Sequence, residues 1–234
     1  MFAGPNGSGK STIKAKVAEI NPNVLGVYIN PDDIEREIAA SGRIDFTHFK
    51  IKTTEGLIFA SLRNSTQLSD KGLLNELSKL TFDKNALSFT GVSLNSYFVS
   101  ALADFLHERL IESRISFSFE TVMSHPNKIN LLDRSHTGGF RNYLYYVATE
   151  DPEINISRVK TRVLEGGHDV PTDKLVARYY RSLENLLDAV RATDRTYIFD
   201  NSGTESFLGR DHGRKKDRDQ EFKRACMVQE IRTR

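Results

Sequence analysis

The sequence contains few of the features that mark secreted or membrane proteins. Cys226 is the only cysteine among 234 residues, so no disulfide can form within the chain, which fits a reducing compartment. No apolar run approaches the roughly 20 residues that a membrane-spanning helix needs. No signal peptide precedes the first motif, which begins at Gly4. These absences make the cytoplasm the expected location and a membrane partner unexpected.

The net charge is small as well. The chain has 33 Lys and Arg residues against 31 Asp and Glu residues, a net charge of +2, which gives no case for a nucleic-acid partner. Residues 203–234 are basic and contain few large apolar side chains, so we expect a disordered or non-native tail there. Residues 1–202, in a chain that is 38% hydrophobic and 27% charged, suit one globular domain.

A phosphate-binding pattern stands near the start of the chain. The stretch "GPNGSGKST" has the spacing G-x-x-x-x-G-K-S, and "KSTIKAKVAEI" after it is typical of a helix. Glycines let a backbone curl around phosphates with its N–H groups inward, and the helix N-terminus adds its dipole. Lys10 suits the β- and γ-phosphates of ATP, and the Ser11 hydroxyl suits Mg²⁺. The residues predicted to contact the nucleotide are Gly4, Pro5, Asn6, Gly7, Ser8, Gly9, Lys10, Ser11 and Thr12.

Further along the chain, strand patterns alternate with helical ones. The expected strands include "VLGVYIN", "ISFSFET", "FRNYLYYVAT" and "RTYIFD". This alternation predicts an α/β P-loop NTPase fold, a parallel sheet with helices on both faces, with a helical insertion at about residues 43–113. Only Met1–Ala3 precede the loop, where a strand of about five residues is usual. Either the first strand is a stub or the start codon lies upstream, and we favour the second reading.

Several classes of phosphate-loop protein are excluded by missing motifs. Transporter-type ATPases carry an LSGGQ-like signature and an apolar run followed by Asp-Glu, and neither occurs here. Switch GTPases need an Asn-Lys-x-Asp motif, which is also missing. The remaining class is a small-molecule kinase, which needs a carboxylate near the acceptor hydroxyl and cations around the transferring phosphate.

The candidate carboxylates follow two of the expected strands. Asp32 and Asp33 come after the second strand, at the end where open α/β sheets bind ligands. One of them can take a proton from a hydroxyl group, although Asp behind a proline also commonly caps a helix. Glu120 and Thr121 end the next strand and suit substrate hydroxyls, or Mg²⁺ through water, or a merely solvated strand end.

The candidate cations are arginines on two expected helices around "EGGHDVP". Arg162 and Arg178 can act as a lid whose planar guanidinium groups bind phosphate oxygens. Arg158 and Arg181 lie close to them in the sequence, and all four can equally be solvated side chains.

The order of these motifs resembles a known family. "FAGPNGSGKST", "YINPDDI", "FSFETVMSH", "GGHDVPTDKLVARYYRSLENL" and "YIFDNS" are together similar to the zeta-toxin-like P-loop kinases, in particular their stand-alone chromosomal branch. The resemblance covers most of residues 1–202. Two positions depart from the classical toxins, which have Asp in place of Asn30 and Glu-Gly-Thr in place of Glu-Thr-Val.

The resemblance implies an activity and roles for residues. It implies an ATP- and Mg²⁺-dependent kinase that phosphorylates a hydroxyl group of a UDP-sugar such as UDP-N-acetylglucosamine, and an antitoxin protein as a partner. It assigns catalytic roles to Lys10, Asp32, Arg162 and Arg178, substrate contacts to Glu120 and Thr121, and the metal to Ser11. A non-catalytic ATP-binding regulatory protein, or a decayed toxin relative, is the alternative.

Overall fold

The computed structural model of the chain describes residues 1–166, 170–203 and 206–211. The chain forms two compact units, the first from Met1–Val24 together with the chain from Glu120 onward, and the second from Leu25–Phe119. The insertion that the sequence predicts at residues 43–113 lies inside the second unit.

The first unit is built on a largely parallel sheet with the strand order β6-β1-β7-β8-β9. Only the pair β8–β9 is antiparallel among these neighbours. The strands are β1 (Phe2–Ala3), β6 (Phe117–Thr121), β7 (Tyr143–Ala148), β8 (Arg195–Asp200) and β9 (Ser206–Asp211). Strand β6 contributes its last two residues to this unit and its first three to the second unit.

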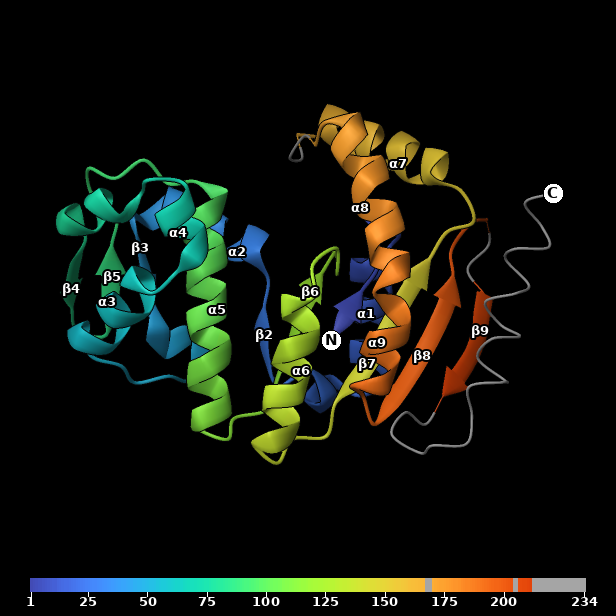
Figure 1. Cartoon of the computed structure of the whole chain (residues 1–234), viewed down its shortest axis with the longest axis horizontal. Helices are drawn as coiled ribbons and strands as arrows, with labels where there is room; N and C mark the ends of the chain where they lie inside the picture. The colour runs from blue at the N-terminus through green and yellow to red at the C-terminus, as the bar shows by residue number, and fades with distance from the viewer. Residues whose placement is uncertain (167–169, 204–205, 212–234) are drawn as a thin grey trace. The chain divides into compact units, whose positions relative to one another are not determined.

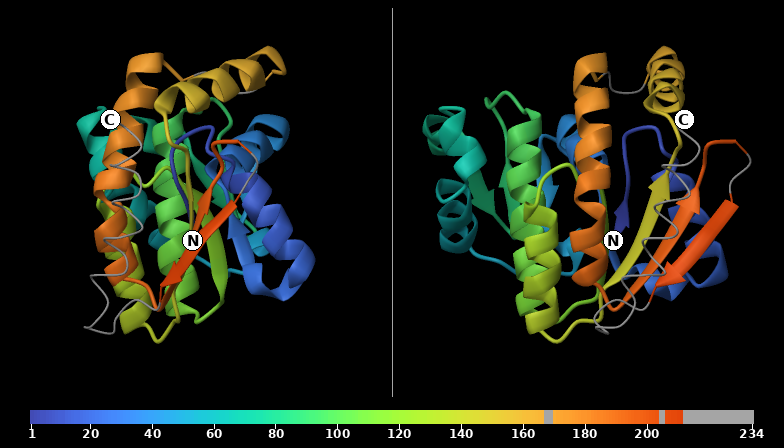
Figure 2. Two further views of the ribbon diagram at one scale, coloured as in Figure 1. Left: turned by 90° about the vertical axis from the view of Figure 1, so that its right-hand side faces the viewer. Right: turned by 45° about the vertical axis from the view of Figure 1, so that its right-hand side comes forward.

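Helices cover both faces of this sheet. Helix α1 lies on one face, and helices α6, α8 and α9 lie on the other (Figures 1 and 2). Helix α7 follows β7 and packs on α8. The helices are α1 (Lys10–Ile20), α6 (Asn127–Thr137), α7 (Pro152–Leu164), α8 (Thr172–Glu184) and α9 (Leu186–Arg191). The predicted α/β fold, a parallel sheet between helices, is confirmed.

The end of the sheet differs from the sequence prediction. A solvated tail is predicted from residue 203, but residues 206–211 form strand β9, which pairs antiparallel with β8. The backbone hydrogen bonds of β8 would otherwise stay open at a sheet edge, and this pairing satisfies them. Residues 212–234, the rest of the predicted tail, lie outside the described residues.

Strand β1 is short, yet it lies between β6 and β7 and is fully buried. The ring of Phe2 stacks on that of Tyr145, with ring centroids 5.0 Å apart. The Met1 amino group donates a hydrogen bond to the carbonyl oxygen of Tyr143 at 2.7 Å. Burial lowers the pKa of this amino group from 8.0 to about 5, because a charged amine is poorly solvated there.

This burial predicts a pH dependence of stability for the chain with a free Met1 amine. Between pH 5 and 8 the unfolded amine binds a proton and the folded amine does not, so the free energy of unfolding rises with pH. The rise is at most about 4 kcal/mol, since each pKa unit corresponds to about 1.4 kcal/mol. Urea unfolding at several pH values measures it. The same protein acetylated at Met1 is the control, and an identical pH profile for both proteins would contradict the prediction.

The second unit contains a small antiparallel sheet where the sequence predicts helices alone. Its strand order is β3-β5-β4, and β2 pairs in parallel with the first part of β6. The strands are β2 (Val27–Ile29), β3 (Arg43–Asp45), β4 (Thr81–Asp83) and β5 (Ala86–Ser88). The helices are α2 (Pro31–Ser41), α3 (Glu55–Arg63), α4 (Thr66–Asp70) and α5 (Ser96–Glu112), with short 3₁₀ turns at Phe46–Phe49 and Leu74–Lys79. A further 3₁₀ turn, Pro22–Leu25, lies at the boundary of the two units. Helix α5 contributes more buried apolar side chains than any other helix or strand described in this unit, and it contacts α2, α3 and α4.

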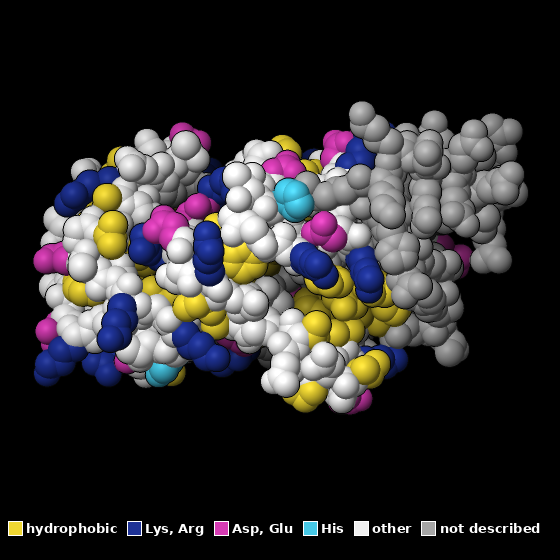
Figure 3. Space-filling view, turned by 90° about the horizontal axis from the view of Figure 1, so that it is seen from below, with side chains coloured by type: hydrophobic (Ala, Val, Ile, Leu, Met, Phe, Trp, Pro, Cys, Tyr) yellow, Lys and Arg dark blue, Asp and Glu magenta, His cyan; other side chains and the backbone are white. Residues whose placement is uncertain are grey.

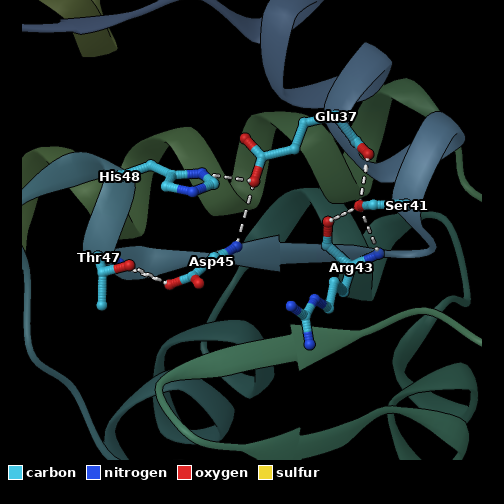
Figure 4. Close-up of polar contacts among 6 residues, drawn as sticks. All are labelled: Glu37, Ser41, Arg43, Asp45, Thr47 and His48. Carbon is cyan, nitrogen blue, oxygen red and sulfur yellow. Dashed lines mark hydrogen bonds and ion pairs between the residues drawn. The ribbon is translucent and has the colours of Figure 1, made fainter.

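A polar cluster fixes the C-terminal end of helix α2 (Figure 4). One carboxylate oxygen of Glu37 accepts from the backbone N–H of Asp45 at 3.2 Å and lies 3.1 Å from Nδ1 of His48. The hydroxyl and backbone N–H of Thr47 donate to the Asp45 carboxylate at 2.6 and 2.9 Å, and these bonds lower the pKa of Asp45. The cluster ties α2, which carries Asp32 at its other end, to strand β3 and the turn that follows.

The surface charge agrees with the small net charge. On the face drawn in Figure 3, Lys and Arg side chains are scattered over both units with Asp and Glu side chains between them. In the part of the chain that the structure describes, no helix is long and apolar enough to cross a membrane.

Candidate functional site

The predicted phosphate loop joins β1 to α1 and depends on its glycines. Gly4 and Gly9 have φ angles of 141° and 97°, which side chains disfavour. A Cβ atom on Gly4 would lie 2.2 Å from the carbonyl oxygen of Val147, and one on Gly9 would lie 2.3 Å from Nδ2 of Asn201. The loop therefore curls tightly against the backbone of Val147 and the side chain of Asn201.

The loop also leads into the N-terminus of an 11-residue helix. No side chain caps α1, so its N-terminal dipole is available to an anion. The ammonium group of Lys10 donates to the carbonyl oxygens of Gly4 and Pro5 at 3.0 and 2.8 Å, so it is held over the loop. Buried Oγ of Ser8 and Oδ1 of Asn6 have no hydrogen-bond partner among the described residues. These features fit the triphosphate of a nucleotide.

The structure brings Ser11 and Glu120 together. The Ser11 hydroxyl donates to a carboxylate oxygen of Glu120 at 3.0 Å. Both groups are oxygen ligands of the kind that Mg²⁺ prefers, and Mg²⁺ usually takes few protein ligands beside nucleotide phosphates. The sequence leaves Glu120 open between substrate hydroxyls, Mg²⁺ through water and a solvated strand end, and the family resemblance implies a substrate contact. The bond to Ser11 favours the Mg²⁺ reading. Thr121 Oγ1 accepts from the backbone N–H of Met123 at 3.0 Å, so this hydroxyl also shapes the turn after β6.

The structure separates the roles of the two neighbouring aspartates in the second unit. Asn30 caps α2, because its side-chain oxygen accepts from the backbone N–H of Asp32 at 3.0 Å. The carboxylate of Asp33 pairs with Arg36 at 2.8 Å. The Asp32 carboxylate is exposed and has no partner among the described residues. Asn30 thus supplies the cap, while Asp32 and Asp33 both lie in the first turn of α2, where a carboxylate stabilises the helix dipole.

The arginines of α7 and α8 differ in burial. The two helices pack through an apolar cluster of Ile156, Val159 and Leu175. Arg178, which the sequence predicts to contact phosphate, is half-buried, whereas Arg162, predicted for the same role, is exposed. Arg158, one turn earlier on α7, is half-buried, and its Nη1 atom is buried without a hydrogen-bond partner among the described residues.

Two asparagines that the sequence did not single out contact the loop. Nδ2 of Asn155 donates to the carbonyl oxygen of Asn6 at 2.7 Å, and Nδ2 of Asn201 donates to that of Ser8 at 2.8 Å. Asn155 lies early in α7 and Asn201 directly follows β8. No local pattern marks either residue, because both roles arise from contacts between segments far apart in the sequence.

One protein-family model matches the chain. Residues 84–212, more than half of the chain, match the family model described as zeta toxin. This stretch includes Glu120 and the arginines but neither the phosphate loop nor Asp32. A Haemophilus influenzae protein named only as uncharacterized is 33% identical over 69 residues, which are 30% of this chain and 49% of that protein. The chain thus spans about half the length of the curated relative it matches.

Among solved structures, one from the PezAT chromosomal toxin–antitoxin system of Streptococcus pneumoniae is similar, with a TM-score of 0.48 at 15% identity. The alignment covers 99% of this chain and 85% of that chain.

Proposed function

The chain belongs to the zeta toxin family, and we propose that it is an ATP-dependent kinase that phosphorylates a hydroxyl group of a small molecule. We propose a UDP-sugar such as UDP-N-acetylglucosamine as the acceptor, following the family resemblance. The observation that carries the proposal is the loop from Gly4 to Gly9, which closes against Val147 and Asn201 and leads into the uncapped N-terminus of α1. Helix N-termini with such loops bind phosphate groups.

In this proposal, different residues of the first unit bind the phosphates of ATP and its Mg²⁺. The loop backbone and Lys10 bind the phosphates, and Lys10 offsets negative charge on the group being transferred. Ser11 and Glu120 are the residues that would hold Mg²⁺, since their oxygens lie 3.0 Å apart. A bound Mg²⁺ neutralises charge on the transferring phosphate.

Asp32 supplies the base of the proposed reaction. The acceptor oxygen attacks the γ-phosphorus, and the bond between that phosphorus and the bridging oxygen breaks to release ADP. The hydroxyl proton passes to the Asp32 carboxylate, which has no partner of its own among the described residues. We also propose that a protein partner of antitoxin type restrains the activity.

The test of this function is transfer of labelled phosphate. The full chain is incubated with γ-labelled ATP, Mg²⁺ and a panel of UDP-sugars, and products are separated by chromatography. Labelled UDP-sugar supports the proposal, and label on another alcohol would keep the kinase but overturn the proposed acceptor. Tight ATP binding with no transfer to any acceptor would favour a non-catalytic nucleotide-binding protein.

The arginines provide a prediction within this function. Because Arg158 and Arg178 are half-buried while Arg162 is exposed, we expect Arg158→Lys and Arg178→Lys each to slow turnover about tenfold or more. Lysine keeps the charge but cannot make the planar two-pronged contact with phosphate oxygens. Steady-state kinetics with the three single lysine variants, including Arg162→Lys, ranks the three positions. If turnover falls only in Arg162→Lys, the phosphate contact belongs to Arg162, as the sequence predicts.

A further inference from the structure

The side chain of Asn155 is placed to hold the phosphate loop. It is 2% exposed, and its Nδ2 donates to the carbonyl oxygen of Asn6, in the middle of the loop, at 2.7 Å. Its Oδ1 accepts a hydrogen bond from the buried hydroxyl of Thr149, the residue directly after β7. Since a hydroxyl donor faces Oδ1, the amide has its NH₂ group turned toward the loop.

The residue that orients Asn155 is itself fixed by helix α8. The phenol of Tyr179 donates to the carbonyl oxygen of Thr149 at 2.6 Å. Burial raises the pKa of Tyr179 to about 12, so this donor keeps its proton at neutral pH. The side chain of Asn155 is therefore held in place by a chain of buried hydrogen bonds from Tyr179 through Thr149.

A second asparagine also holds the loop. Asn201 donates to the carbonyl oxygen of Ser8 at 2.8 Å. A Cβ atom on Gly7 would lie 2.7 Å from the backbone oxygen of Asn155, which shows how closely the loop approaches α7. The Asn6 and Ser8 carbonyls accept from these amides, so they are not turned toward a bound anion; within the loop, the Ser8 N–H donates to the Pro5 carbonyl at 3.3 Å.

We propose that Asn155, oriented by Thr149, is a positioning residue that keeps the loop in its phosphate-binding conformation before a nucleotide arrives. The inference rests on the proposed function, because it concerns the same nucleotide site. Without Asn155 the Asn6 carbonyl loses its buried partner, the peptide is free to rotate, and part of the binding energy must be spent on ordering the loop.

The test measures the dissociation constant of Mg·ADP by calorimetry, and the KM for ATP, on the full chain. Asn155→Ala is expected to raise both about tenfold, the effect of about 1.4 kcal/mol, with a smaller change in kcat. Asn155→Asp keeps the size and the Thr149 bond but faces Asn6 with an acceptor, so its loss should be at least as large. Thr149→Val, which removes only the orienting hydroxyl, should raise the dissociation constant less.

The matched control is Asn185→Ala. Nδ2 of Asn185 donates to the carbonyl oxygen of Met123 at 3.0 Å, the same kind of bond away from the phosphate loop. We expect this variant to lose thermal stability and to bind Mg·ADP as tightly as the parent.

The outcomes separate this inference from the proposed function. If the parent binds no nucleotide, the proposed function fails first. If the parent binds Mg·ADP and both Asn155 variants bind it equally well, or if Asn185→Ala weakens binding as much, the positioning role is overturned. If Asn155→Ala does not fold, the positioning role is overturned when Asn155→Asp and Thr149→Val both bind Mg·ADP as tightly as the parent.

Discussion

Replacing Lys10 with alanine is expected to slow ATP-dependent phosphoryl transfer by about 10²–10³-fold or more, the usual cost of losing one preorganised group that stabilises transition-state charge. Nζ of Lys10 lies 3.0 and 2.8 Å from the carbonyl oxygens of Gly4 and Pro5. The ammonium group is therefore already held over the loop, and it can turn to phosphate oxygens with little reorganisation. No other group of the loop carries a positive charge.

The measurement compares single-turnover rates with labelled ATP in the parent and the variant. Lys16→Ala is the control, because Lys16 is an exposed lysine of the same helix and its loss changes the net charge equally. Lys10→Met, which keeps most of the side-chain length, separates loss of charge from a change in loop packing. Parental rates in both Lys10 variants would remove this residue from the mechanism.

How well the sequence predicts the fold depends on local signals. Helix α2 runs over Pro31–Ser41, the stretch "PDDIEREIAAS", because Asn30 caps its start and Gly42, with a φ angle of 73°, ends it. The helix expected after Pro171 instead divides into α8 and α9 at Asn185. There the side-chain amide bonds to the Met123 carbonyl, a partner far away in the sequence.

The small sheet of the second unit could not be predicted for a related reason. Strands β4 and β5 have three residues each, too few to show an alternating pattern. They are joined by Lys84 and Asn85, which have φ angles of 47° and 64°. Hairpin turns with positive φ usually carry glycine, so "KN" gives little signal.

In the candidate site too, some residues could be predicted from the local sequence and others only from the fold. The loop and Lys10 follow from spacing, since the chemistry is carried by neighbours in the sequence. The choice between Arg158 and Arg162 does not, because one helical turn separates them and only burial distinguishes them. Asn155 was missed because an asparagine in a helix is unremarkable until the segment opposite it is known.

The second large effect is expected for Asp32. Asp32→Asn should reduce phosphoryl transfer by about 10²–10⁴-fold, the range that general base catalysis supplies. The amide keeps the size of the carboxylate but cannot accept the hydroxyl proton. Helix α2 should survive, because Asn30 and Pro31 start it and the Asp32 backbone N–H still donates to Asn30.

The affinity for ATP distinguishes this variant from a damaged protein. In the proposed mechanism the loop and Lys10 hold ATP without Asp32, so the dissociation constant of ATP should stay near that of the parent. Any growth defect caused by expressing the parent should be relieved by the same substitution. Circular dichroism and thermal unfolding check that the fold is retained.

Asp33→Asn is the matched control for Asp32→Asn. It removes the same charge from the adjacent position, but the carboxylate it removes is paired with Arg36 at 2.8 Å on the surface, an ion pair worth little. Its turnover should therefore remain close to that of the parent. If Asp33→Asn is inactive and Asp32→Asn is not, the proton goes to the paired carboxylate and the assignment of the base is wrong. If both variants transfer phosphate at the parental rate, neither aspartate is the base, and the acceptor hydroxyl must lose its proton to another group.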